Sequence, residues 1–103
     1  MLEKVDKLAK TIEGSKDKRE ITIFTLSTCM WCKKCKRWLA EHDVKYRYID
    51  LDKLDFKDKA EILDFLRANY SQRISYPFMI YDNEYVIGYD PNKYEELING
   101  EGS

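Results

Sequence analysis

Hydrophobic and polar positions follow two periods along the chain, and these periods predict its secondary structure. Leu2, Val5, Leu8 and Ile12 recur at helical spacing with charged residues between them, which is typical of an amphipathic helix. The predicted helices span residues 2–13, 30–42, 57–70 and 91–99. Short runs of β-branched and aromatic residues predict strands instead. The predicted strands span residues 21–26, 46–50, 78–81 and 85–87.

The order of these elements indicates the architecture. A strand–helix–strand beginning implies a right-handed crossover and a parallel pair of strands. The turn at residues 82–84 is short enough to join the last two strands as an antiparallel hairpin. We therefore predict an α/β fold, a four-stranded mixed sheet flanked by helices, with an extra N-terminal helix. The predicted division is an N-terminal helix and linker at 1–18, one domain at 19–100 and a frayed tail at 101–103.

Composition narrows the class of protein. The chain has 103 residues, 44% hydrophobic residues and a net charge of −1, which suits one globular domain with no basic excess for nucleic acid. It lacks the apolar run of about 20 residues that a membrane span needs. The first residues are charged and do not resemble a signal peptide. We expect a cytoplasmic monomer that binds neither nucleic acid nor membrane.

The clearest chemical signal is the segment Cys29-Met30-Trp31-Cys32, which follows a strand and opens a helix. The free N–H groups and the dipole of a helix N-terminus stabilise an anion there, so the thiolate of Cys29 is favoured. Cys32 lies one turn further along the helix. From that position its thiol can attack a mixed disulfide formed at Cys29 and release the reduced substrate.

A second signal is Tyr76-Pro77, directly before a predicted strand. A cis bond at this position would turn the Tyr76 backbone toward the Cys29 loop, where its N–H and C=O groups can pair with an extended substrate. Only about 5–6% of X-Pro bonds in folded proteins are cis. From the residues alone, the trans isomer is therefore the expectation.

These two signals and the element order resemble the glutaredoxin branch of the thioredoxin superfamily, over residues 20–100. The matching pieces are residues 25–32, Tyr76-Pro77 and residues 87–91. The resemblance implies a thiol–disulfide oxidoreductase with Cys29 as nucleophile, Cys32 as resolving thiol and Pro77 in the cis form. It also implies a redox-active Cys29–Cys32 disulfide and no tightly bound cofactor. The residues that we expect at the substrate are Trp31, Tyr76, Pro77, Gly88, Tyr89 and Asp90.

Two subtypes of this branch differ in their electron donor. Glutaredoxins that use glutathione carry Pro-Tyr between the cysteines, a lysine three residues before the first cysteine, and a Gly-Gly pair. This chain has Met30-Trp31, Leu26 and Gly88-Tyr89 at those places. The segment 88–93 looks more like the NrdH-redoxins, which take electrons from thioredoxin reductase and donate them to ribonucleotide reductase. Trp31 departs from that subtype, in which glutamine is usual.

The expected partners are accordingly a protein with a disulfide as substrate, and either thioredoxin reductase or glutathione as electron donor. Cys35 lies outside the family motif, and a buried core thiol is its simplest interpretation. One alternative is a metal or iron–sulfur module that uses Cys29, Cys32 and Cys35, with His42 or a second chain as a further ligand. Another is a domain that only binds a partner, because a fold does not determine a function.

Overall fold

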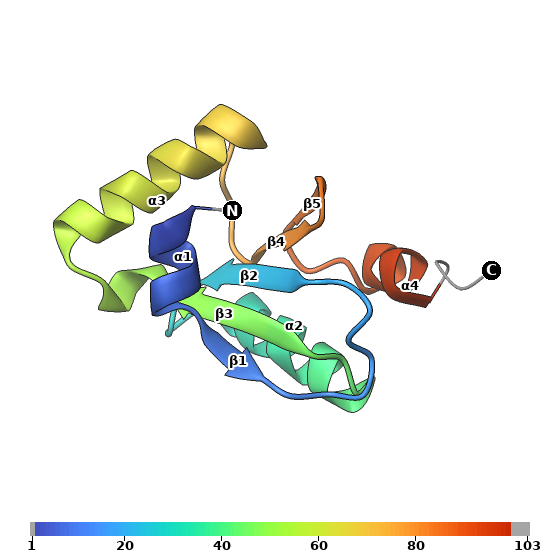
Figure 1. The fold of residues 1–103 in the computed structure, drawn as a ribbon. Coiled ribbons are helices and arrows are strands. Elements are labelled where there is room, and N and C mark those ends of the chain that lie inside the picture. The colour runs from blue at the N-terminus through green and yellow to red at the C-terminus, as the bar shows by residue number, and fades with distance from the viewer. Residues whose placement is uncertain (1, 100–103) are drawn as a thin grey trace.

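A five-stranded mixed sheet forms the centre of the computed structural model, which describes residues 2–99 (Figure 1). The strand order is β1-β3-β2-β4-β5, with β2 and β3 parallel and the other neighbouring pairs antiparallel. In chain order the elements are α1 (Glu3–Leu8), β1 (Lys10–Ile12), β2 (Ile21–Thr25), α2 (Met30–Glu41), β3 (Tyr46–Asp50), the short 3-10 helix η1 (Leu51–Lys53), α3 (Phe56–Asn69), β4 (Phe78–Tyr81), β5 (Glu84–Ile87) and α4 (Pro91–Asn99). The predicted α/β fold with helices flanking a mixed sheet is confirmed.

The helices cover the two faces of the sheet in pairs. On one face, α2 and α4 pack against Ile21 and Ile23 of β2. On the other face, α1 and α3 pack against Phe24 of the same strand. Successive residues of a strand point to opposite faces, so a central strand covered on both sides is buried at each of its residues, as β2 is. This central strand leads directly into the loop that carries Cys29.

The N-terminal segment differs from the prediction of one helix over residues 2–13 and of a four-stranded sheet. Helix α1 ends at Leu8, Ala9 is extended, and residues 10–12 form β1, which pairs antiparallel with β3. Without β1, the outer edge of β3 would leave a row of backbone N–H and C=O groups unpaired. Pairing satisfies those groups, whereas continuing the helix would not. The strand β1 is exposed at each residue, so its apolar Ile12 contributes little to the core.

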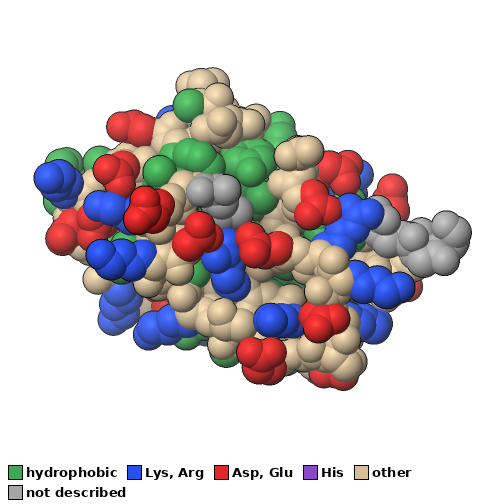
Figure 2. Space-filling model, viewed as in Figure 1, with side chains coloured by type: hydrophobic (Ala, Val, Ile, Leu, Met, Phe, Trp, Pro, Cys, Tyr) green, Lys and Arg blue, Asp and Glu red, His purple; other side chains and the backbone are tan. Residues whose placement is uncertain are grey.

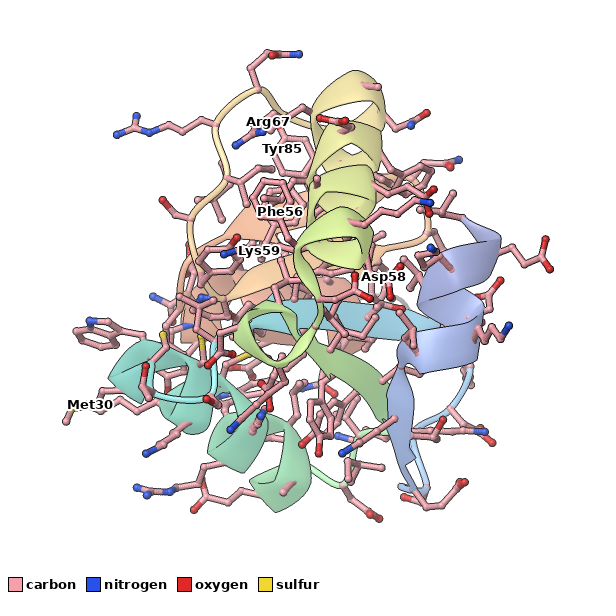
Figure 3. All side chains as sticks on the ribbon, turned by 90° about the vertical axis from the view of Figure 1, so that its left-hand side faces the viewer. Met30, Phe56, Asp58, Lys59, Arg67 and Tyr85 are labelled. Carbon is pink, nitrogen blue, oxygen red and sulfur yellow. The ribbon has the colours of Figure 1, made fainter. Side chains whose placement is uncertain are left out.

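Ion pairs hold α1 against the rest of the molecule. The Lys4 ammonium group lies 2.5 Å from Asp58 and 3.3 Å from Glu61, both on α3, and Figure 3 shows Asp58 on the side of α3 that faces α1. Val5 of α1 is fully buried in the same apolar cluster as α3. Residues 2–12 therefore share the sheet and the core with the rest of the chain. A domain division at residue 18 stays a prediction, and the predicted tail at 101–103 lies outside the described residues.

The surface in Figure 2 carries Lys, Arg, Asp and Glu side chains over most of the visible face, and hydrophobic side chains gather between α3 and β5. Tyr85 and Ile87 of β5 are exposed. Within residues 2–99, no helix is long and apolar enough to cross a membrane.

The loop before β2 makes a close backbone approach at Gly14. A Cβ atom at this position would lie 2.5 Å from the carbonyl carbon of Val44 and 2.6 Å from the amide nitrogen of Lys45. Both of these are backbone atoms, which cannot swing aside as a flexible side chain would. We expect Gly14→Ala to lower the free energy of unfolding by about 1–3 kcal/mol, as overpacking does, measured by urea denaturation. In the same loop, Asp17→Ala alters an exposed side chain and should change this free energy by less than about 0.5 kcal/mol. An equal effect of the two substitutions would contradict the steric argument.

Candidate active site around Cys29

Cys29 is the N-cap residue of α2, at the end of the loop that follows β2. Its backbone is extended, with φ −82° and ψ 118°, and its Sγ accepts a hydrogen bond of 3.2 Å from the backbone N–H of Cys32. This N–H is one of the donors that a helix N-terminus leaves without an intrahelical partner. Cys29 as a residue is half-buried, whereas Cys32 and Cys35 are buried, so Cys29 is the cysteine that a substrate can approach. A negative charge on Sγ would face both this donor and the positive end of the α2 dipole.

Cys32 lies one turn into the helix, where only 1% of its surface is exposed. Burial raises the pKa of its thiol to about 12, and the hydrogen bond with Cys29 acts in the same direction. Cys32 therefore keeps its proton at neutral pH. Both cysteines are free thiols in this structure. The arrangement pairs an accessible sulfur at a helix terminus with a shielded, protonated one directly behind it.

The loop between β2 and Cys29 is held by Asp52 of η1, a residue that sequence reasoning missed. The Asp52 carboxylate accepts hydrogen bonds from the Ser27 hydroxyl at 2.5 Å and from the Ser27 backbone N–H at 2.8 Å. These bonds hold the pKa of Asp52 below its usual range. The signal in the sequence was an aspartate shortly after the second strand of a parallel pair. The carboxyl ends of such strands meet at the same edge of the sheet.

Two aromatic rings form a wall beside the cysteine pair. Trp31 and Tyr89 are stacked, with ring centroids 5.9 Å apart and an interplanar angle of 28°. The Lys34 ammonium group lies 4.8 Å from the centre of the Trp31 ring, at a distance suited to a cation–π contact. Trp31 is 56% exposed and Met30 is 70% exposed, and Figure 3 shows Met30 projecting outward from the start of α2. The residues between the two cysteines thus offer an apolar surface to a partner.

The Tyr76–Pro77 peptide bond is cis, as the family resemblance implied and against the base rate for proline. Pro77 is buried, and its carbonyl accepts a hydrogen bond of 2.8 Å from the backbone N–H of Gly88. Burial raises the pKa of the Tyr76 hydroxyl, and the charge of Arg67 opposes this rise. Tyr76 itself is partly buried and packs against the apolar cluster under α1 and α3.

Gly88 and Asp90 lie in the loop between β5 and α4. Gly88 has a φ of +81°, a left-handed conformation that residues with a Cβ rarely adopt. The Asp90 carboxylate accepts a hydrogen bond of 3.2 Å from the backbone N–H of Lys93, so this side chain caps α4. Asp90 was predicted as a substrate-binding residue. The structure gives its side chain a partner in its own helix.

Cys35 is fully buried in the apolar cluster under α2, together with Trp38 and Leu39. Burial raises the pKa of its thiol to about 11. His42, at the end of α2, stacks on Trp38 with ring centroids 3.7 Å apart, and its Nδ1 lies 2.8 Å from the Trp38 carbonyl oxygen. Within residues 2–99, no three His, Cys, Asp or Glu side chains converge in a way that could hold a metal ion.

Comparison with known proteins adds a family to this geometry. The family described as Glutaredoxin matches residues 21–86. The Gene 56 protein of Mycobacterium phage D29 is 34% identical over 80 residues, which cover 77% of this chain and 82% of that protein. The glutaredoxin-like protein NrdH of Lactococcus lactis subsp. cremoris is 27% identical over 78 residues, covering 75% of this chain and 97% of its own length. The crystal structure of the glutaredoxin from Methanosarcina mazei aligns with a TM-score of 0.78 at 26% identity, over 88% of this chain and 87% of that one.

Proposed function

Given that this chain belongs to the glutaredoxin family, we propose that it reduces disulfides of protein substrates through Cys29 and Cys32. One observation carries the proposal. Cys29 is half-buried and caps α2, and its Sγ accepts a hydrogen bond of 3.2 Å from Cys32 N–H, while Cys32 behind it is buried. A nucleophile needs access and a stabilised anion, and a resolving thiol needs protection from competing partners. The two cysteines meet these two requirements separately.

The reaction that these groups support has two exchange steps. In the first, the Cys29 thiolate attacks one sulfur of the substrate disulfide. The substrate S–S bond breaks, its other sulfur leaves as a thiolate that takes up a proton, and a mixed disulfide forms at Cys29. In the second, Cys32 loses its proton and attacks the Cys29 sulfur. The Cys29–Cys32 disulfide forms, and the second substrate thiol leaves, so two electrons have passed to the substrate.

A dithiol reductase suits the site better than glutathione as the source of those electrons. Leu26 occupies the position where glutathione-using relatives carry a lysine, and it packs against the apolar cluster under α1 and α3. A glutathione carboxylate would lose a charge-assisted partner there. Tyr89 stands where those relatives carry a second glycine, and it stacks on Trp31. The similarity to NrdH of L. lactis supports thioredoxin reductase as donor and ribonucleotide reductase as a client.

The choice of donor can be tested directly. We expect turnover of a protein disulfide such as insulin with NADPH and thioredoxin reductase to exceed, by about tenfold or more, turnover with NADPH, glutathione and glutathione reductase. The reason is that Leu26 offers no cationic partner to a glutathione carboxylate. A hydrogen bond to a charged group contributes about 1.5–3 kcal/mol to binding. The measurement is the rate of NADPH oxidation in the two coupled assays.

Leu26→Lys supplies the matched variant for this comparison. It should raise the glutathione-coupled rate, because it supplies a cationic partner for a carboxylate. The rate with thioredoxin reductase should stay within about twofold, because Leu26 is only partly buried and the apolar stem of a lysine can cover the same cluster. If the unmodified protein turned over mainly with glutathione, it would be a glutathione-dependent glutaredoxin, and the interpretation of Leu26 and Tyr89 would be wrong.

A further inference from the structure

Tyr94 on α4 is a buried polar residue that the two exchange steps do not use. Its side chain is fully buried, and its hydroxyl donates a hydrogen bond of 2.7 Å to the carbonyl oxygen of Gly88. Burial raises the pKa of this hydroxyl, so it remains a donor at any physiological pH. The bond crosses from the helix to the loop that precedes it. A buried hydroxyl in this position therefore fixes where the Gly88 peptide lies.

Gly88 is held from a second side as well. Its N–H donates a hydrogen bond of 2.8 Å to the carbonyl oxygen of Pro77, at the start of β4. The glycine thus joins the proline segment to α4. No atom lies within 4 Å of the place where its Cβ would be, so the glycine meets a conformational need at φ +81° and does not relieve crowding.

Tyr89, the residue after Gly88, connects Tyr94 to Trp31 beside the cysteine pair. The ring of Tyr89 meets Tyr94 edge to face, with centroids 6.0 Å apart and an interplanar angle of 73°. Its other neighbour is Trp31, on which it stacks at 5.9 Å. Both distances lie in the range where aromatic pairs attract each other. A continuous path of contacts leads from Tyr94 through Gly88 and Tyr89 to Trp31.

We propose that Tyr94 is a positioning residue that holds Tyr89 against Trp31, and that this aromatic wall favours protein disulfides over small disulfides. The inference rests on the proposed function and adds a determinant of specificity to it. A small disulfide contacts little more than the Cys29 sulfur when it reacts. A folded or extended polypeptide also covers the surface beside that sulfur, where Trp31 is 56% exposed. Stacked aromatic rings are rigid and apolar, and they lose little entropy when a partner covers them.

The test is Tyr94→Phe, which removes the hydroxyl and keeps the ring. We expect the KM for insulin to rise about threefold to tenfold, because Tyr89 is no longer held against Trp31 and the substrate loses about one aromatic contact. The KM and kcat for a small disulfide, bis(2-hydroxyethyl) disulfide, should change much less. The matched control is Tyr81→Phe, because Tyr81 is equally buried and its hydroxyl also binds α4, at the Leu97 carbonyl. That control should leave both KM values close to those of the unmodified protein.

A second measurement, the fluorescence of Trp31, reports on the contact between Tyr89 and Trp31 without any substrate. The chain has two tryptophans, so a Trp38→Phe background leaves Trp31 as the only one. In that background Tyr94→Phe should increase the quenching of Trp31 fluorescence by acrylamide, because the Tyr89 ring no longer shields one face. Tyr89→Leu should do the same and should raise the KM for insulin in parallel. This variant leaves Tyr94 in place, so it tests the wall even if Tyr94→Phe failed to fold.

The outcomes test the two parts of the proposal separately: the positioning of Tyr89 by Tyr94, and the preference for protein disulfides. Unchanged quenching in a folded Tyr94→Phe variant would overturn the positioning role. Increased quenching with equal losses on both disulfides would overturn the specificity role and leave Tyr94 as a structural residue. If the unmodified protein reduced neither disulfide with any donor, the proposed function would fail, while the quenching measurement would still decide whether Tyr94 positions Tyr89.

Discussion

Replacing Cys29 with serine is expected to abolish disulfide reduction, with a fall in kcat/KM of at least about 10³-fold. The geometry gives the reason. The Cys29 sulfur is the half-exposed member of the pair and lies at the N-terminus of α2. A serine hydroxyl there would stay protonated at neutral pH, and an oxygen nucleophile cannot form the mixed disulfide. Insulin reduction, followed by turbidity with dithiothreitol as donor, measures the loss.

Cys32→Ser should produce a different defect, which distinguishes the two roles. The first exchange can still occur, but no thiol behind Cys29 can resolve it, so a mixed disulfide should accumulate. Mass spectrometry without reducing agent detects that adduct. Cys35→Ala serves as the control, because Cys35 is fully buried in the core cluster under α2, where a substrate cannot reach it. This variant should retain most of the activity. Full dithiol activity in Cys29→Ser would show that the nucleophile is assigned to the wrong residue.

The second large effect is a loss of stability in alkali that is larger in the reduced protein than in the oxidised one. Burial raises the pKa of Cys32 from 9.0 to about 12 and that of Cys35 from 9.0 to about 11. Between pH 9 and 12 the unfolded chain has released protons that the folded chain still holds. The unfolded state therefore binds fewer protons in this window, and the free energy of unfolding falls as pH rises.

The size of this loss follows from the shifts. The stability that comes from the raised pKa values of these thiols is fully present below pH 9. It decreases as the pH rises toward the pKa values of the folded protein. A shift from 9.0 to about 12 at Cys32 corresponds to a loss on the order of 4 kcal/mol. The buried Tyr46 hydroxyl, whose pKa is raised from 10.0 to about 12, adds to the fall above pH 10. Few domains of this size have a large reserve of stability beyond such a loss.

Urea denaturation of the reduced protein from pH 8 to pH 11.5 measures this dependence. The control is the same protein with the Cys29–Cys32 disulfide formed, because Cys32 then has no proton to lose in either state. Its stability should fall less steeply over the same interval. An equal slope in the two redox forms would contradict the burial of a protonated Cys32 thiol, and a flat profile in both would contradict the shifts at Cys35 and Tyr46 as well.

The sequence identified the elements that depend on short-range pattern. The run of β-branched and apolar residues at 21–26 predicted a buried strand, and residues 21–25 form the strand at the centre of the sheet. A helix was predicted over residues 30–42, and residues 30–41 form α2. The Cys29–Cys32 spacing placed one sulfur at a helix terminus and the other one turn inward. All of these features involve residues that are near neighbours in the chain, so local periodicity is enough to reveal them.

Tertiary structure decided the features that join distant segments. Residues 10–12 continue a helical spacing, yet they form β1 because the open edge of β3, more than 30 residues later, can satisfy their backbone groups. Asp52 holds the loop before Cys29 through Ser27, and no local pattern shows that these two residues meet. The bond from Tyr94 to Gly88 depends on where α4 packs against the sheet. The sequence by itself therefore determined the position of the cysteine pair at the start of its helix. The surroundings of that pair depend on which distant backbone and side-chain groups the packed sheet brings within hydrogen-bonding distance.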